Sequence, residues 1–137
     1  MDASKQIAET KDRKAVLSTL WIFVMLNYLY GDLAMMMFHP TAYQKVIAGM
    51  SEGLVLGATI LMEALIVMVL LSRILKYQVN RWANIIMGVV GTAFAALTLG
   101  GKPPAFYVFL SAMEIACTLF IVWYAWTWPN PLAQNAE

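Results

Sequence analysis

The fold is decided by the stretch LVLGATILMEALIVMVLL, residues 54–71, in which Glu63 is the only charged side chain. A hydrocarbon core of roughly 30 Å requires a helix of about 20 mostly apolar residues. Backbone polar groups find no water in lipid, so such stretches are expected to be helical. Three further stretches satisfy the same criterion, and the four predicted spans cover residues 15–38, 46–72, 82–100 and 105–128.

The composition of the whole chain agrees with this interpretation. Hydrophobic residues make up 61% of the 137 residues and charged residues 12%, whereas soluble domains hold about 45–50% and about 25%. Fourteen of the 17 charged side chains lie at the N-terminus, at the chain end or in three short connections. We therefore expect a single domain over residues 1–137, an all-α integral membrane protein built as an antiparallel four-helix bundle. The lipid bilayer is its expected partner, and a net charge of +1 gives no reason to expect nucleic acid.

Lys and Arg are unevenly distributed between the two ends of the predicted bundle. Seven lie in the N-terminal segment or between the second and third spans, whereas the two opposite connections carry only Lys45 and Lys102. Because short basic loops stay in the cytoplasm, this asymmetry predicts that both termini are cytoplasmic. The aromatic residues expected to form a belt at that interface are Trp123, Tyr124, Trp126 and Trp128, with Trp21 and Trp82 nearby.

Small residues at four-residue spacing indicate where helices approach closely, because packing rather than a hydrophobic drive associates helices in lipid. One stripe consists of Gly49, Gly53 and Gly57. A second consists of Gly88, Thr92, Ala96 and Gly100. Either stripe fits packing within the bundle or a homodimer, and both alternatives stay open.

Three acidic residues deep within the spans carry the functional hypothesis, Asp32, Glu63 and Glu114, whereas Glu52 lies at the outer mouth of the second span. An ionisable side chain in hydrocarbon is costly and marks a functional site by default. No Lys or Arg lies within the spans to pair with them. Helical spacing places each acid on a face with tyrosine or hydroxyl side chains, so we expect all three to face one interior cavity.

Intramembrane carboxyls with different surroundings suit general acid–base chemistry on a lipophilic small molecule, such as isomerisation, cyclisation or epoxide opening. In this interpretation Glu114 donates or removes the proton at mid-depth. Glu63 is its charge partner, and Asp32 is a second acid nearer the outer mouth. The side chains expected to bind the substrate are Tyr28, Asn27, Thr59, Tyr107 and Ser111.

Two other function classes fit the same residues. A proton-coupled transporter uses carboxyls for reversible proton binding, and the missing counter-cation leaves room for a positively charged solute. An accessory membrane subunit uses them only for assembly. No metal and no cofactor are expected, because the chain has one cysteine, Cys117, one histidine and no glycine-rich phosphate loop.

The segment LSTLWIFVMLNYLYGD, residues 17–32, resembles a family of short four-span bacterial membrane proteins of unknown function. The likeness is weaker over the later spans. It implies four helices and a bacterial plasma membrane, and it implies no activity, ligand or site residue.

Overall fold

The structure, a computed structural model, describes residues 3–129, and within this range every regular element is a helix. Four of the helices are long and apolar enough to cross a membrane, so the predicted all-α fold is confirmed. The elements are α1 (Ala3–Phe38), α2 (Pro40–Ala48), α3 (Glu52–Ile74), α4 (Tyr77–Thr98), the short 3₁₀ helix η1 (Leu99–Gly101) and α5 (Ala105–Trp126).

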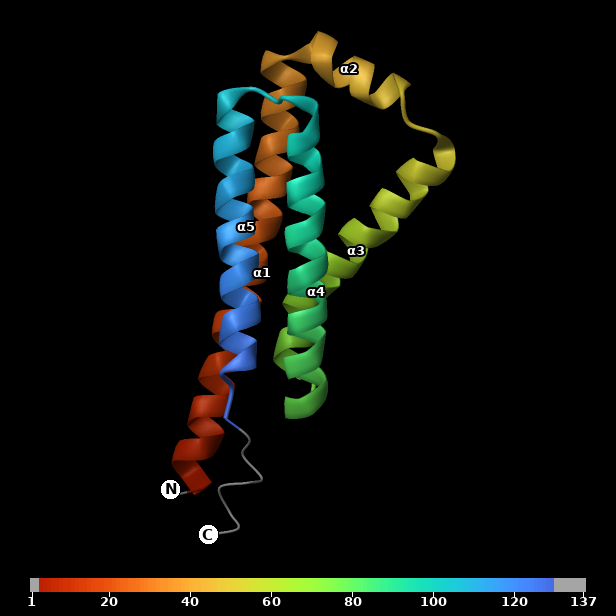
Figure 1. Cartoon of the computed structure of the whole chain (residues 1–137). Coiled ribbons are helices and arrows are strands. Elements are labelled where there is room, and N and C mark those ends of the chain that lie inside the picture. The colour runs from red at the N-terminus through yellow and green to blue at the C-terminus, as the bar shows by residue number, and fades with distance from the viewer. Residues whose placement is uncertain (1–2, 130–137) are drawn as a thin grey trace.

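The four long helices alternate in direction, as an antiparallel bundle requires (Figure 1). α1 packs on α3 and α5, and α4 packs on α3 and α5. The start of α1, the end of α5 and the α3–α4 connection lie at one end of the molecule, whereas α2 lies at the other (Figure 1). The N-terminal half of α3 leans away from the other helices, so the bundle is closed at one end and open at the other.

The polar N-terminal segment belongs to α1, which begins at Ala3 rather than near residue 15. A helix of 36 residues is about 54 Å long at ~1.5 Å per residue, well beyond a hydrocarbon core of roughly 30 Å. Arg13 anchors the extra turns, because its Nη1 donates to the Tyr124 carbonyl at 3.3 Å and its guanidinium lies 4.8 Å from the centre of the Tyr124 ring. The first span is therefore the apolar part of a longer helix.

The second predicted span, 46–72, is wrong at its start because residues 49–51 interrupt the helix. Gly49 ends α2, and Ser51 begins α3 by accepting a hydrogen bond from the Leu54 N–H on its side-chain oxygen at 3.3 Å. Such an N-cap satisfies one of the free donors at a helix start. The break lets α2 and α3 run in different directions (Figure 1).

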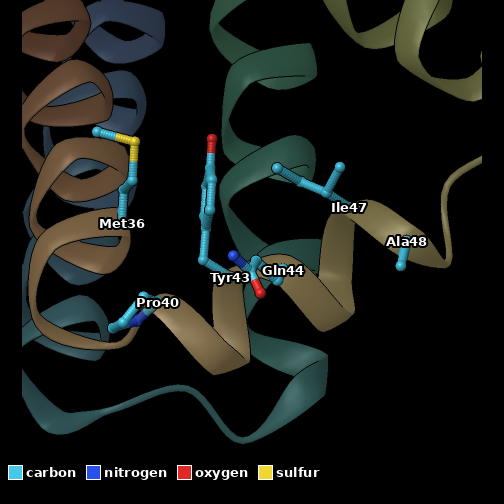
Figure 2. A pocket seen from close by; sticks show the side chains of 6 residues that line it. All are labelled: Met36, Pro40, Tyr43, Gln44, Ile47 and Ala48. Atoms are coloured by element: carbon cyan, nitrogen blue, oxygen red, sulfur yellow. The ribbon is translucent and has the colours of Figure 1, made fainter.

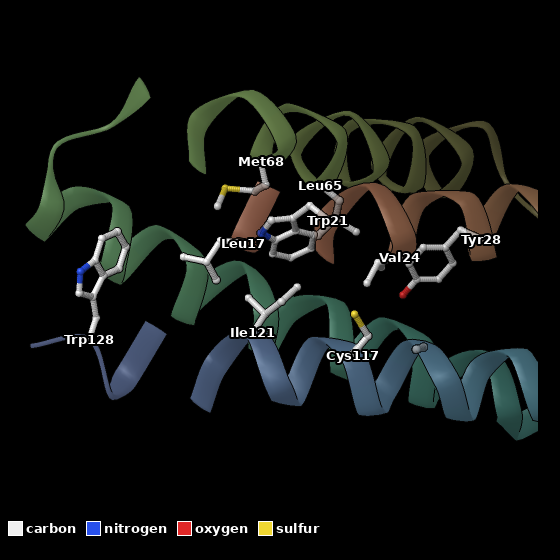
Figure 3. Packing of buried hydrophobic residues seen from close by; sticks show 10 residues of the cluster. Leu17, Trp21, Val24, Tyr28, Leu65, Met68, Cys117, Ile121 and Trp128 are labelled. Atoms are coloured by element: carbon white, nitrogen blue, oxygen red, sulfur yellow. The ribbon is translucent and has the colours of Figure 1, made fainter. Parts of the chain in front are cut away.

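A stripe of α1 residues spaced three or four apart forms the centre of the core (Figure 3). It faces Leu65 and Met68 of α3, and Cys117 and Ile121 of α5. This spacing keeps one helical face inward. The α1 members of the stripe are Leu17, Trp21, Val24 and Tyr28.

The two small-residue stripes differ in whether they pack against another helix. Gly88 lies against α5 so closely that a Cβ atom there would be 2.6 Å from Val122 Cγ2, and Thr92 Oγ1 lies 2.7 Å from Thr118 Oγ1. Ala96 and Gly100, by contrast, are exposed. Gly53 and Gly57 meet nothing within 4 Å, so they take no part in packing between the described helices.

The residues of the predicted aromatic belt differ in their exposure. Trp82, Trp123 and Trp126 are exposed, as interfacial anchors should be. Trp21 and Trp128 are buried, so these two side chains pack against other described residues. Trp128 packs edge-on against Tyr77, whose hydroxyl donates to the Trp128 carbonyl at 2.9 Å.

Candidate functional site

Glu114 lies on the inward face of α5 and is only 4% exposed. Its side chain makes no hydrogen bond with any other described residue, although buried polar groups are nearly always paired. Its oxygens are nevertheless not completely covered, because the only fully covered and unpaired side-chain polar atom within residues 3–129 is Nε of Arg81. The carboxyl is therefore slightly exposed rather than sealed among the described residues. Ser111 and Thr118, which are three and four residues away, are buried on the same face.

Asp32 is the acidic residue whose carboxyl interacts electrostatically with that of Glu114. Asp32 follows Gly31, where α1 approaches α5 closely. A Cβ atom at Gly31 would lie 3.5 Å from Leu110 Cδ1 and 3.7 Å from Tyr107 Cε2. The Asp32 side chain is exposed, which places it at the edge of the helix contact rather than within it.

Two tyrosines complete the group, because Tyr28 and Tyr107 each interact electrostatically with both carboxyls. The Tyr28 hydroxyl donates to the Gly91 carbonyl of α4 at 3.2 Å. We call these four residues the carboxyl–tyrosine cluster: Tyr28, Asp32, Tyr107 and Glu114.

Glu63 is not a member of the cluster. It is exposed on α3, and no interaction with Asp32 or Glu114 brings it to the site. The buried residues of α3 are Leu65, Met68 and Ser72, all in its C-terminal half. The N-terminal half of α3 leans outward, so the three carboxyls do not converge as expected. Only Asp32 and Glu114 interact with each other, and Glu63 lies apart from them.

The remaining predicted binding residues are placed as follows. Ser111 is buried one turn before Glu114. Asn27 donates to the Phe23 carbonyl at 2.9 Å, and Thr59 donates to the Val55 carbonyl at 2.9 Å. These last two side chains are bonded within their own helices and lie outside the carboxyl–tyrosine cluster.

An apolar pocket of about 340 Å³ lies between the end of α1 and α2. Figure 2 shows the Tyr43 ring standing between Met36 of α1 and Ile47 of α2. Met36 is one helical turn beyond Asp32. Small-molecule pockets commonly span about 300–1,000 Å³ and are mostly apolar. The pocket is therefore of a size and polarity that accept a lipophilic group near the cluster.

A second group of buried polar residues was missed by the sequence analysis. Asn84 Oδ1 accepts from Trp21 Nε1 at 2.7 Å and from Ser72 Oγ at 3.1 Å, and Asn84 Nδ2 donates to Asn80. Asn80 Nδ2 in turn donates to the Ser72 carbonyl at 2.6 Å. Two asparagines four residues apart were the available signal. Since these groups bond one another, they join α1, α3 and α4 and offer no free group for chemistry.

Within residues 3–129 no three His, Cys, Asp or Glu side chains gather in a way that could hold a metal ion. The two carboxyls and two phenol groups of the carboxyl–tyrosine cluster can transfer protons and form hydrogen bonds.

Comparisons with known proteins identify the family but no activity. No curated protein and no solved structure shows a match to the chain. The model of a family of unknown function, DUF6326, matches residues 5–134, which agrees with the predicted uncharacterised four-span family. The chain belongs to this family of unknown function.

Proposed function

We propose that this protein is a membrane-embedded acid–base enzyme that acts on a lipophilic small molecule in a bacterial plasma membrane, with both termini in the cytoplasm. The observation that carries the proposal is the Glu114 carboxyl, which is almost fully buried, forms no side-chain hydrogen bond with another of residues 3–129 and interacts electrostatically with Asp32. A scaffold carboxyl in such a place would be bonded. An unpaired one that is not completely covered is available to a substrate.

The reaction type that fits the pair is an isomerisation by two proton transfers. The carboxylic acid of one residue donates its proton to one carbon of a substrate double bond, and the carboxylate of the other removes a proton from the carbon attached to the far end of that double bond. The double bond moves by one position, the product keeps the composition of the substrate, and the two residues exchange protonation states. Transfer of one proton between the two carboxyls, directly or through water, resets the pair for the next turnover.

The tyrosines orient the substrate in this proposal. Tyr28 and Tyr107 both interact electrostatically with the carboxyls. The Tyr28 hydroxyl donates to the Gly91 carbonyl, but the oxygen of either hydroxyl can still accept a hydrogen bond from a polar group of the substrate. The apolar remainder of the molecule occupies the pocket beside Met36 and Tyr43. This arrangement favours a substrate with one polar end and a hydrocarbon body.

The test uses the purified full-length protein in liposomes made from a bacterial lipid extract and incubated in D₂O. A carboxyl that protonates carbon delivers deuterium, so the expected result is one lipid-soluble species that gains deuterium and shifts in chromatographic retention. Glu114→Gln keeps the volume of the side chain and removes its titratable proton, so deuterium incorporation should fall at least ~100-fold. Glu52→Gln, a carboxyl change at the first turn of α3, is the matched control and should keep the activity.

Deuterium incorporation that is equal in Glu114→Gln and the unaltered protein would contradict the proposal. Glu63→Gln distinguishes a site made of Asp32 and Glu114 alone from the three-carboxyl site expected from the sequence. Only the three-carboxyl site requires Glu63 for activity.

A proton-coupled transporter is the second candidate, favoured by one observation. α3 is buried only through its C-terminal half, which leaves the other half free to move relative to α1 and α4 (Figure 1). Alternating access requires such a moving element. Solute-driven pH change inside proteoliposomes, dependent on Glu114 and without deuterium incorporation, would select transport over catalysis.

A further inference from the structure

A second pocket, of about 710 Å³, lies at the end of the bundle that carries the described start of α1 and end of α5. Its lining comes from the first turns of α4, and it shares no residue with the carboxyl–tyrosine cluster. The residues that matter are Gln78, Arg81, Trp82 and Ile86.

Arg81 is the charged group of this pocket, and most of its bonding capacity is unused. Its Nη2 donates to the Trp126 carbonyl at 3.0 Å, and its guanidinium lies 5.7 Å from the centre of a Trp126 ring. Nε is covered and has no acceptor within residues 3–129. A guanidinium carries five N–H donors, and leaving a covered donor unpaired is costly. Nη1 likewise forms no hydrogen bond within residues 3–129 but, unlike Nε, is not completely covered, so its N–H groups can take an acceptor from outside the chain.

The face of α4 that borders the pocket changes from polar to apolar along the helix. Gln78, Trp82 and Ile86 follow one another at four-residue intervals, so they lie above one another on one face. Gln78 is polar and exposed, Trp82 is 54% exposed, and Ile86 is an exposed aliphatic side chain. This order matches a phospholipid, whose polar head, glycerol region and acyl chain follow one another in the same direction.

The surrounding charge favours an anion. Seven of the nine basic residues of the chain belong to the N-terminal segment or to residues 73–81, at this end of the molecule. Clusters of Lys and Arg beside membrane-spanning helices attract anionic lipid head groups, and a planar guanidinium matches the oxygens of a phosphate.

We propose that the pocket formed by Gln78, Arg81, Trp82 and Ile86 binds an anionic glycerophospholipid, with its phosphate on Arg81 and Gln78 and an acyl chain along Ile86. The phosphate of the bound lipid accepts from the Nη groups of Arg81 that are not covered. Through Arg81 it also fastens the C-terminal turn of α5 to the start of α4, because the same guanidinium holds the Trp126 carbonyl.

The experiment is a titration of the full-length protein in detergent with phosphatidylglycerol or phosphatidylcholine of identical acyl chains, followed by native mass spectrometry. The unaltered protein should retain phosphatidylglycerol about tenfold better than phosphatidylcholine. Arg81→Gln should reduce this preference to about twofold or less. Gln78→Glu should do the same by repelling the phosphate and pairing with Arg81 three residues away, and it leaves the bond to Trp126 in place. Because Gln78 is exposed, this second variant tests the pocket even if Arg81→Gln fails to fold.

Lys76→Gln is the matched control, because it removes one positive charge from the same connection without lining the pocket. It should keep most of the preference. Equal losses in Lys76→Gln and Arg81→Gln would assign the effect to the charge of the connection and overturn the proposal, as would an unaltered protein without any preference. Soluble glycerol 3-phosphate tests the other source of a phosphate. Displacement of the lipid by an equimolar amount would show that the site takes a soluble phosphate instead.

Discussion

At the scale of single residues, hydrogen bonding separates scaffold from site. Asn84 and Glu114 are both buried polar residues within apolar helices. Asn84 uses its oxygen and its amide nitrogen in bonds to three other residues, whereas Glu114 has no side-chain hydrogen bond within residues 3–129. A fully bonded group stabilises the bundle, and an unbonded one is available for chemistry.

Asn84→Leu should therefore destabilise the protein without removing any candidate catalytic group. The change leaves Trp21 Nε1 and the Ser72 hydroxyl without their acceptor, at a cost of roughly 1–3 kcal/mol for each group. The measurement is the free energy of unfolding in mixed micelles, titrated with a denaturing detergent. Thr19→Val is the control, because the Thr19 hydroxyl is exposed and bonds only the Ala15 carbonyl of its own helix. Equal stability of the two variants would show that the buried asparagine does not hold the helices together.

The sequence predicts part of the site at this scale. Glu114 is found from sequence because Ser111 and Thr118 mark the polar face of a helix whose other residues are apolar. Asn84 was missed because its partners come from two other helices, and spacing along one helix does not reveal a contact between helices. Asn80 also lay outside the predicted third span, which the structure begins at Tyr77.

At the scale of elements, α3 and α4 show what hydropathy can and cannot predict. Both were predicted as spans, and both are long apolar helices. α3 is apolar around most of its circumference, so its sequence does not indicate which face packs inward. The exposure of Glu63 follows from this, as does the open surface at Gly53 and Gly57. The break at residues 49–51 was missed because a glycine in an apolar run is compatible with either a continuous or an interrupted helix.

Two glycines of these helices should respond oppositely to the same substitution. Gly88→Ala places a methyl group 2.6 Å from Val122 Cγ2 and 3.2 Å from the Thr118 carbonyl oxygen, so α4 and α5 must separate slightly. Overpacking of this kind costs about 1–3 kcal/mol. Gly57→Ala meets nothing within 4 Å and should stabilise α3 by about 0.5–1 kcal/mol through its higher helix propensity.

The measurement for both glycine variants is again the free energy of unfolding, now combined with the oligomeric state. A Gly57→Ala variant that is less stable and dissociates from a dimer would mean that this glycine face is packed against a second copy. The same result would support the predicted homodimer. A stabilised monomer would show that the face borders lipid.

At the scale of the whole molecule, most of the positively charged residues lie at one end. The described start of α1, the end of α5 and the α3–α4 connection share this end (Figure 1). Seven of the nine basic residues belong to the N-terminal segment or to residues 73–81, which lie there. The arginines there also bond the last carbonyls of α5, since Arg13 donates to Tyr124 and Arg81 donates to Trp126. Cations at a helix C-terminus are stabilising, so these two residues contribute to the fold as well as to the charge of this end.

The predicted orientation can be tested by labelling single cysteines from each side of the membrane. Lys5→Cys lies at the basic end, and Lys102→Cys lies in the connection between α4 and α5 at the opposite end. Because basic segments stay in the cytoplasm, an impermeant maleimide added to intact cells should label Lys102→Cys and spare Lys5→Cys. Inverted membrane vesicles should give the opposite pattern. The native Cys117 is buried in the core, so unaltered protein supplies the background signal. Labelling of Lys5→Cys in intact cells would reverse the orientation. Labelling of both positions from the same side would contradict the arrangement of the four helices as spans, since an odd number of crossings separates the two residues.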